Sequence, residues 1–262
     1  MVKRDELIKF IHQTIGEDLL EKAQTIDKSA NGVQIFGQDN VNKLVLGVSA
    51  SLDFFKEAVK AKADFCILHH GLGLTEKHIY NSRPNMALQK RLKIIFDNDL
   101  TVAGFHFSLD SHYKIGNNAL IIAKLGARQL DLNYFDKWGW VAEFDKSQDV
   151  KKLAEKCSNI FSNDIFAVYG GKQKVTRIGV VSGGGKPYGS WAMELAEKKI
   201  DLHITGDIGE SGPALAKDMG FNYFACGHYA TEVFAVQELG KIIKSHYKNK
   251  LEVEFIDISN TL

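Results

Sequence analysis

The sequence has only three cysteines and three prolines, and its acidic and basic residues almost balance. Its three cysteines (Cys66, Cys157 and Cys226) form no C-x-x-C pair, which excludes a disulfide framework and favours a reducing, cytoplasmic compartment. No apolar run approaches the roughly 20 residues of a membrane helix, so we expect no membrane attachment. A formal net charge of +1 argues against bare nucleic acid as a partner. A globular protein with a sizeable core is the class that remains.

Buried strands alternate with amphipathic helices along most of the chain. An opening helix is predicted from about Arg4 to Leu20, and "KLVLGVSAS", "DFFKEAVKAKA" and "DFCILHHG" then read as strand, helix and strand. The order returns in "TRIGVVSGGG", "YGSWAMELAEKK" and "IDLHITGD". Strand–helix–strand units indicate parallel pairing. We therefore predict an α/β fold of two related lobes, produced by duplication, with mainly parallel sheets and α/β/α layers.

The predicted lobes meet in the middle of the chain. The first lobe is assigned to residues 1–130, and residues 131–262 are assigned to a connecting excursion and the second lobe. The excursion, from about Trp138 to Gln173, has the pattern of a strand, a helix and a strand. Both lobes are expected to contribute to one metal site.

Polar residues gather where the predicted strands end. "LHHG" ends one strand in His69 and His70, and "HITGD" ends another. His106 is followed four residues later by Asp110, and His228 is followed at the same spacing by Glu232. Ligands of parallel α/β sheets bind beyond the carboxyl ends of the strands. The repeated spacing therefore points to a functional site.

Imidazole and carboxylate groups are the ligands of zinc, iron or manganese. Neighbouring side chains on extended backbone point in opposite directions, so two metal ions taking one histidine each fit the His69–His70 pair better than one ion does. Two such ions activate water at neutral pH. The predicted ligands of these two divalent ions are His69, His70, Asp110, His228 and Glu232.

Other polar residues are open to two interpretations. His106 is either a catalytic proton shuttle or a residue that orients Asp110. "SGGGK", with Gly184 and Lys186, is either an anion cradle or a tight turn, and "NGVQ", with Asn31 and Gln34, either contacts substrate or forms a turn. Structural roles are expected for the remaining histidines, His12, His78, His112, His203 and His246.

The motifs "NGVQIFG", "LHHG", "HFSLD", "VSGGGK", "HITGD" and "GHYATE" occur in an order that resembles the Nif-three-like proteins, known as GTP cyclohydrolase 1 type 2. The resemblance spans essentially the whole chain. It implies intertwined α/β repeats, a toroidal homohexamer, two metal ions per subunit and the same five ligands. Many members have proline where this chain has Gly71, and many carry an inserted domain for which the connection here is too short.

The resemblance implies a small-molecule substrate, GTP, whose imidazole ring is opened by hydrolysis with release of formate. The same donor set also suits hydrolysis of a phosphoester or an amide bond. An alternative from another class is a metal-binding hexameric assembly or interaction protein without cyclohydrolase activity.

Overall fold

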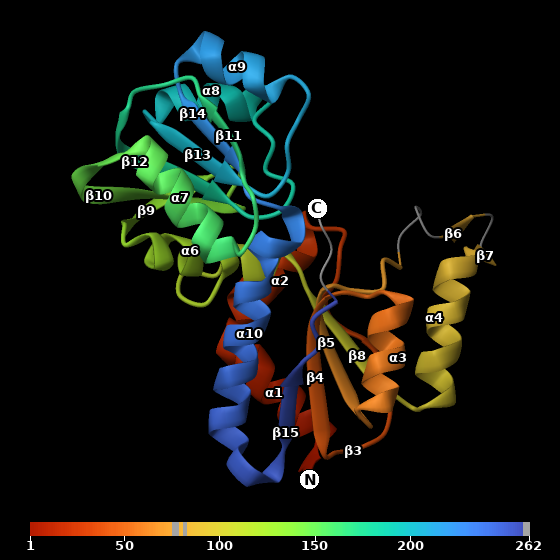
Figure 1. The fold of residues 1–262 in the computed structure, drawn as a ribbon. Coiled ribbons are helices and arrows are strands. Elements are labelled where there is room, and N and C mark those ends of the chain that lie inside the picture. Colours follow the sequence, from red (N-terminus) through yellow and green to blue (C-terminus); the bar gives the residue numbers. More distant parts are fainter. Residues whose placement is uncertain (75–78, 81–82, 259–262) are drawn as a thin grey trace. The chain divides into compact units, whose positions relative to one another are not determined.

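The computed structural model describes residues 1–74, 79–80 and 83–258, and the chain divides into two compact units (Figure 1). The first unit comprises Met1–His112 together with Ala235–Ile258, and the second comprises Tyr113–Phe234. This division differs from the predicted boundary between residues 130 and 131. The C-terminal segment returns to the first unit, because its strand β15 (Glu252–Phe255) pairs in parallel with β4 (Lys43–Ser49).

The first unit is built on a five-stranded sheet of order β15-β4-β5-β8-β2. Its other strands are β5 (Phe65–His70), β8 (Thr101–Phe105) and β2 (Asn31–Ile35). The strands β15, β4, β5 and β8 are parallel, and β2 is antiparallel at the edge. Short strands form two small sheets beside it, β1 (Val2–Lys3) with β3 (Asn40–Val41) and β6 (Ile79–Tyr80) with β7 (Arg83–Pro84).

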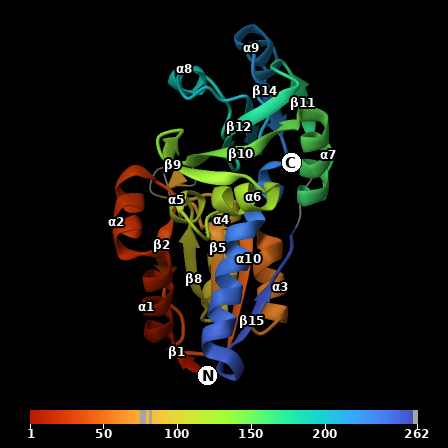
Figure 2. The same ribbon diagram turned by 90° about the vertical axis from the view of Figure 1, so that its left-hand side faces the viewer.

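Helices cover both faces of this sheet (Figure 1 and Figure 2). On one face α3 (Leu52–Lys60) and α4 (Met86–Asp97) bury Phe55 and Leu88 against strand residues such as Cys66. On the other face lie α1 (Arg4–Ile15) and the end of α10 (His228–Tyr247), where Gly240 lies against Leu46. The predicted opening helix is two helices, because Gly16, at φ 97°, separates α1 from α2 (Glu17–Ile26).

The second unit is built on a six-stranded sheet of order β11-β14-β13-β12-β10-β9. Its strands are β9 (Arg128–Tyr134), β10 (Gly139–Asp149), β11 (Phe166–Tyr169), β12 (Lys174–Val181), β13 (Leu202–Thr205) and β14 (Asn222–Ala225). The three central strands β12, β13 and β14 are parallel, whereas β9, β10 and β11 pair antiparallel to their neighbours. The predicted excursion is part of this sheet, since it contributes β10 and the edge strand β11.

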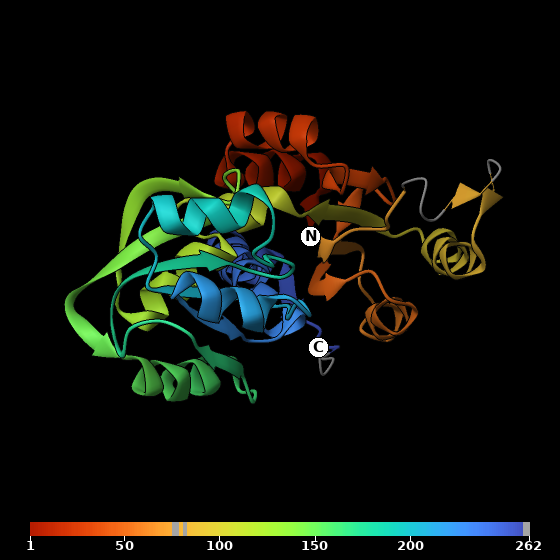
Figure 3. The ribbon, with the colours of Figure 1, turned by 90° about the horizontal axis from the view of Figure 1, so that it is seen from above.

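Two apolar clusters lie on opposite faces of this second sheet. One contains side chains of α6 (Asn117–Leu125) and α7 (Val150–Phe161), and the other contains side chains of α8 (Ser190–Glu197) and α9 (Gly212–Met219). Figure 3 shows α7 and α8 on opposite sides of the sheet. The unit thus has three α/β/α layers, as predicted.

The two units share one strand topology. The orders β2-β8-β5-β4 and β11-β14-β13-β12 correspond, and in each the antiparallel edge strand comes first in the chain. Three parallel strands linked by single helices follow in both. The α/β class is confirmed, and the shared topology is what duplication predicts. No helix among the described residues is both long and apolar enough to cross a membrane.

Candidate metal centre

The double histidine ends β5 in the middle of the first sheet. His69 is fully buried, and its Nδ1–H donates a hydrogen bond to the carbonyl oxygen of Phe105 (3.1 Å). That bond fixes the tautomer in which Nε2 carries the lone pair. The Nε2 atom lies 3.5 Å from the Oδ2 atom of Asp110, a residue of the short helix α5 (Phe107–Ser111).

His70 and His106 lie beside His69. The ring centroid of His69 lies 4.8 Å from that of His70 and 4.9 Å from that of His106. One ring nitrogen of each of the three histidines lies within 4.8 Å of one from each of the others. The expectation that the rings of His69 and His70 point apart is therefore wrong. They share His106 as a neighbour, and Ser49, which pairs with His70 across the sheet, holds the His70 ring at Nδ1 (3.1 Å).

A buried carboxylate orients His106. The Nδ1–H group of His106 donates to Oδ2 of Asp27 at 2.8 Å. Burial by itself raises the pKa of Asp27, but the hydrogen bond and charge of His106, with hydrogen bonds from Ser29 and Asn31, hold that pKa well below its usual range. Asp27 is therefore ionised and accepts from Nδ1–H of His106.

The second unit repeats this arrangement at the start of α10. The Nδ1–H group of His228 donates to Oδ1 of Asp207 at 2.8 Å, and its Nε2 atom lies 3.3 Å from Oε1 of Glu232. The hydrogen bond with Glu232, together with the charges of Glu232 and Asp207, outweighs burial and raises the pKa of His228 to about 9. Without a metal ion His228 is thus an imidazolium at neutral pH.

The glycine-rich loop after β12 packs against Glu232. Gly183 has a φ of 59°, and a Cβ atom there would overlap the Glu232 carboxylate. The carbonyl oxygen of Gly183 accepts hydrogen bonds from the backbone N–H groups of Gly206 and Asp207. Next to it, a Cβ on Gly184 would meet no atom closer than 3.8 Å. The loop therefore forms a tight turn that leaves space for the Glu232 side chain.

The other predicted substrate residues make contacts within the fold. The Asn31 amide donates to Asp27 (3.0 Å) and accepts from the Ser108 hydroxyl (2.9 Å). The Gln34 amide oxygen accepts from the backbone N–H of Leu72, just after the double histidine. Both side chains thus make contacts within the first unit, and their contact with a substrate stays a prediction.

Lys186, the fourth predicted substrate residue, pairs with a residue of the second cluster. Its Nζ atom lies 3.0 Å from Oδ2 of Asp207, the carboxylate that accepts from His228. Any role of Lys186 or Gly184 in substrate binding stays a prediction.

The histidines expected to be structural fit that role where the structure describes them. His12 is partly buried with its ring edge-on to Phe105, His112 follows α5, and His246 stacks on Phe10 at a centroid distance of 3.9 Å. His203 is fully buried and bonded at both ring nitrogens, to Tyr134 and to the Gly185 carbonyl. His78 lies outside the described residues.

The donor set fits metal ions. In the first unit the Nδ1 atoms of His69, His70 and His106 are bonded to oxygens of Phe105, Ser49 and Asp27, and in the second unit Nδ1 of His228 is bonded to Asp207, so that Nε2 is the nitrogen that would ligate a metal. Metal-ligating histidines almost always show this arrangement. The His69–His70–His106 cluster is thus a group that can hold a metal ion. Sequence reasoning missed the partners Asp27, Ser49 and Asp207; only "HITGD" gave a signal, for Asp207.

Comparisons with known proteins agree with this description. The chain is 33% identical over 261 residues to a GTP cyclohydrolase 1 type 2 homolog of Pyrococcus horikoshii, covering 97% of both chains. It is 30% identical over 263 residues to one of Haemophilus influenzae, covering 97% of this chain and 98% of the relative.

Solved structures share the fold over nearly the full length. A protein called ybgI, described as of unknown function, superimposes with a TM-score of 0.84 at 29% identity and covers 100% of both chains. Reduced HcgD from Methanocaldococcus jannaschii gives 0.82 at 25% identity over 98% of both. Residues 2–261 match the family described as Duf34/NIF3 (NGG1p interacting factor 3). The chain therefore belongs to the Duf34/NIF3 family.

Proposed function

We propose that this protein is a metal-dependent hydrolase that opens the guanine imidazole ring of GTP. The observation that carries the proposal is the His69–His70–His106 cluster, a group of side chains that can hold a metal ion and whose Nδ1 atoms are bonded to oxygen partners. The name of the relatives, GTP cyclohydrolase 1 type 2 homolog, supports this substrate class.

The proposed ligands of two divalent ions are His69, His70, Asp110, His228 and Glu232. Zinc, iron or manganese ions bound there would act as Lewis acids and lower the pKa of water to near neutrality. Their donor atoms are already arranged in pairs, His69 with Asp110 (3.5 Å) and His228 with Glu232 (3.3 Å). That both pairs serve one shared site stays a prediction.

His106 is the proposed proton carrier. Its Nδ1–H is held by ionised Asp27, so its Nε2 atom is the one that takes and returns a proton. Asp27 stabilises the imidazolium formed in that step, as a buried carboxylate does for a catalytic histidine. In the predicted alternative, His106 orients Asp110 and transfers no proton.

Two measurements on the same preparations test the proposal. Purified protein should contain about two transition-metal ions per chain by elemental analysis, and incubation with GTP should release formate. His106→Gln should keep the metal and lose formate release, whereas His69→Ala should lose metal; His246→Gln, far along α10, is the control.

Loss of metal from His106→Gln would make His106 a ligand instead. Metal-loaded protein that releases no formate with zinc, iron or manganese would refute the cyclohydrolase and favour a metal-binding assembly. The proposed homohexamer is tested separately by light scattering of the eluted protein.

A further inference from the structure

A pocket of about 290 Å³ lies in the first unit beside His70. Its lining comes from the ends of β4 and β5, from α4, and from the turn before β2. Its polar lining side chains are Ser29, Ser49, Ser51, His70 and Arg91. The volume is at the small end of the range for ligand pockets, roughly 300–1,000 Å³. It therefore suits one small group of a ligand.

The charge of this pocket is positive. Arg91 is the one permanently charged side chain among its described lining residues, and none of those is a carboxylate. The Nε atom of Arg91 is buried without a hydrogen-bond partner among the described residues. A buried guanidinium nitrogen left without an acceptor is costly, and an oxyanion would supply one.

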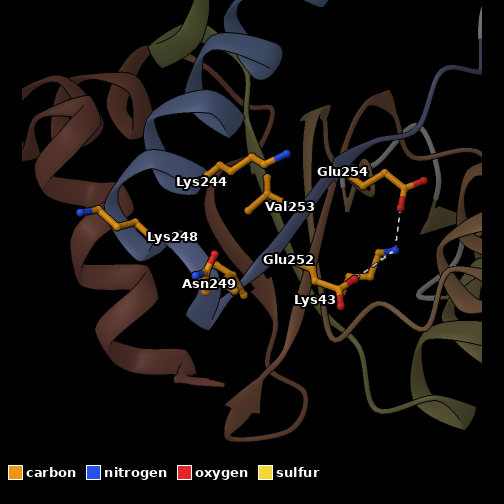
Figure 4. A pocket seen from close by; sticks show the side chains of 8 residues that line it. Lys43, Lys244, Lys248, Asn249, Glu252, Val253 and Glu254 are labelled. Atoms are coloured by element: carbon orange, nitrogen blue, oxygen red, sulfur yellow. Dashed lines mark ion pairs between the residues drawn. The ribbon is translucent and has the colours of Figure 1, made fainter.

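A second pocket of the first unit shows the contrast. It lies along β15 and the end of α10, and Figure 4 shows Lys43 there paired with Glu254 (2.6 Å) and Glu252 (3.7 Å). Both carboxylates of this pocket thus lie beside Lys43, and Lys244 and Lys248 also line it. The pocket beside His70 has no such carboxylate among the residues that the structure describes.

Ser49 links the positive pocket to the histidine cluster. Its Oγ atom lies 3.1 Å from Nδ1 of His70 and also lines the pocket. When Nε2 of His70 serves as a ligand atom, Nδ1 carries the proton and donates it to Ser49. The Ser49 hydroxyl hydrogen is then free to donate to an anion in the pocket. Ser51, by contrast, is used as the cap of α3, where it accepts from the N–H of Phe54.

We propose that this pocket binds a phosphoryl group, with Arg91 as its cation and Ser49 as a hydroxyl donor. Guanidinium groups match the oxygens of phosphate and are less hydrated than ammonium groups, which suits a half-buried site. The inference rests on the proposed function for its substrate, since it would place the phosphate end of a nucleotide next to the metal ligand His70. Phosphate binding itself is independent of that function.

The test is a calorimetric titration of the full-length protein, metal-loaded and after chelator treatment, with inorganic phosphate, GTP and guanosine. Arg91→Gln should weaken binding of phosphate and GTP by roughly tenfold or more, the worth of one charged hydrogen bond. The matched control is Lys90→Gln, which removes the same charge from an exposed neighbour on α4 and should change either affinity by less than about twofold. Guanosine should bind equally to all three proteins.

Ser49→Ala should weaken phosphate binding by a smaller factor. Arg91→Lys replaces Arg91→Gln if circular dichroism shows that the latter is unfolded, and it should bind phosphate more weakly than the wild type. Equal weakening by Arg91→Gln and Lys90→Gln would overturn the proposal, as would wild-type protein that binds neither phosphate nor GTP.

Metal content and formate release are measured on the same samples. Formate release with a KM for GTP that Arg91→Gln leaves unchanged would refute the pocket and keep the hydrolase. Phosphate binding that depends on Arg91 in a protein that releases no formate would support the pocket and refute the hydrolase. A response to inorganic phosphate without a response to GTP identifies free phosphate as the ligand.

Discussion

The Nδ1 atom of His106 lies 2.8 Å from the Oδ2 atom of Asp27. His228 has the same relationship with Asp207, also at 2.8 Å. The two histidines occupy equivalent places after β8 and β14, but their carboxylate partners do not, because Asp27 follows α2 and Asp207 follows β13. The repeat thus includes a histidine and an acid four residues further on, while each unit supplies the carboxylate partner of that histidine from a different segment.

Asp27→Asn tests the role of the first pair. The substitution removes the negative charge that stabilises a protonated His106, so formate release should fall by about tenfold to hundredfold while metal content stays near the wild-type value. The control is Asp53→Asn, a mostly exposed carboxylate paired only with Lys56. Metal loss from Asp27→Asn would instead show that Asp27 supports a ligand.

Gly183→Ala and Gly184→Ala form a matched pair in the glycine-rich loop. The first places a Cβ against Glu232 on a backbone of positive φ and should cost about 1–3 kcal/mol of unfolding free energy, with loss of bound metal. The second meets nothing closer than 3.8 Å and should stay within about 0.5 kcal/mol. Urea unfolding and elemental analysis measure both, and equal effects would disprove the steric argument.

His203 should make stability depend on pH. Burial lowers the pKa of His203 to about 4, from an ordinary value near 6.5. Between these two pH values, His203 is protonated in the unfolded chain and neutral in the folded chain. Folding stability should therefore fall by about 3 kcal/mol as pH drops from 6.5 to 4. Denaturant unfolding across this range checks the loss, and an NMR titration in which the His203 ring protonates near pH 6.5 would contradict it.

His228 should couple metal binding to protons. Its raised pKa means that the imidazolium stabilises the metal-free fold fully below about pH 6.5, an effect lost as pH rises through about 9. A metal ligand must be neutral, so binding at pH 7 should release close to one proton from His228, and affinity should rise with pH up to about 9. Calorimetry in two buffers of different ionisation enthalpy measures the release.

Asp207→Asn is the companion variant for that measurement. It removes one of the charges that raise the pKa of His228 and leaves Glu232 in place, so fewer protons should be released at pH 7. Unchanged proton release in this variant would mean that the released proton comes from another group.

The prediction that both units serve one pair of ions is tested by stoichiometry. His69→Ala and Glu232→Ala should each lower the metal content, and their combination should lose no more than the two ions that a shared site holds. Independent sites predict that Glu232→Ala leaves the ion of the His69–His70–His106 cluster in place. Elemental analysis after gel filtration separates these outcomes.

Much of the fold could be predicted because strand, helix and turn signals are local. The strand end at His70 followed from an apolar run and a polar stop, whereas the helix α10 that begins at His228 was not predicted, because the sequence pattern places His228 at the end of a strand. The place of β15 could not be predicted, since pairing with β4 joins residues about two hundred positions apart in the chain. Gly16 was a local signal for a break that the apolar spacing across it concealed.

The residues of the candidate site likewise divide into those with a local sequence signal and those placed by long-range contacts. Histidines and acids at strand ends were recognisable by chemistry, whereas Asp27 and Ser49 act through long-range contacts that no spacing encodes. Asp27 lies 79 positions from His106, and Ser49 lies 21 positions from His70. Their roles depend on hydrogen bonds formed only after the sheet assembles.

The parallel pairing of β15 with β4 has a consequence for biosynthesis. A ribosome synthesises Lys43–Ser49 early and Glu252–Phe255 some two hundred residues later. During that time β4 has no β15 to pair with, so its edge in the nascent first sheet is exposed. An open edge is a template for mispairing with other chains. Stalled or prematurely terminated translation products of this protein should therefore be prone to aggregate and should depend on chaperones.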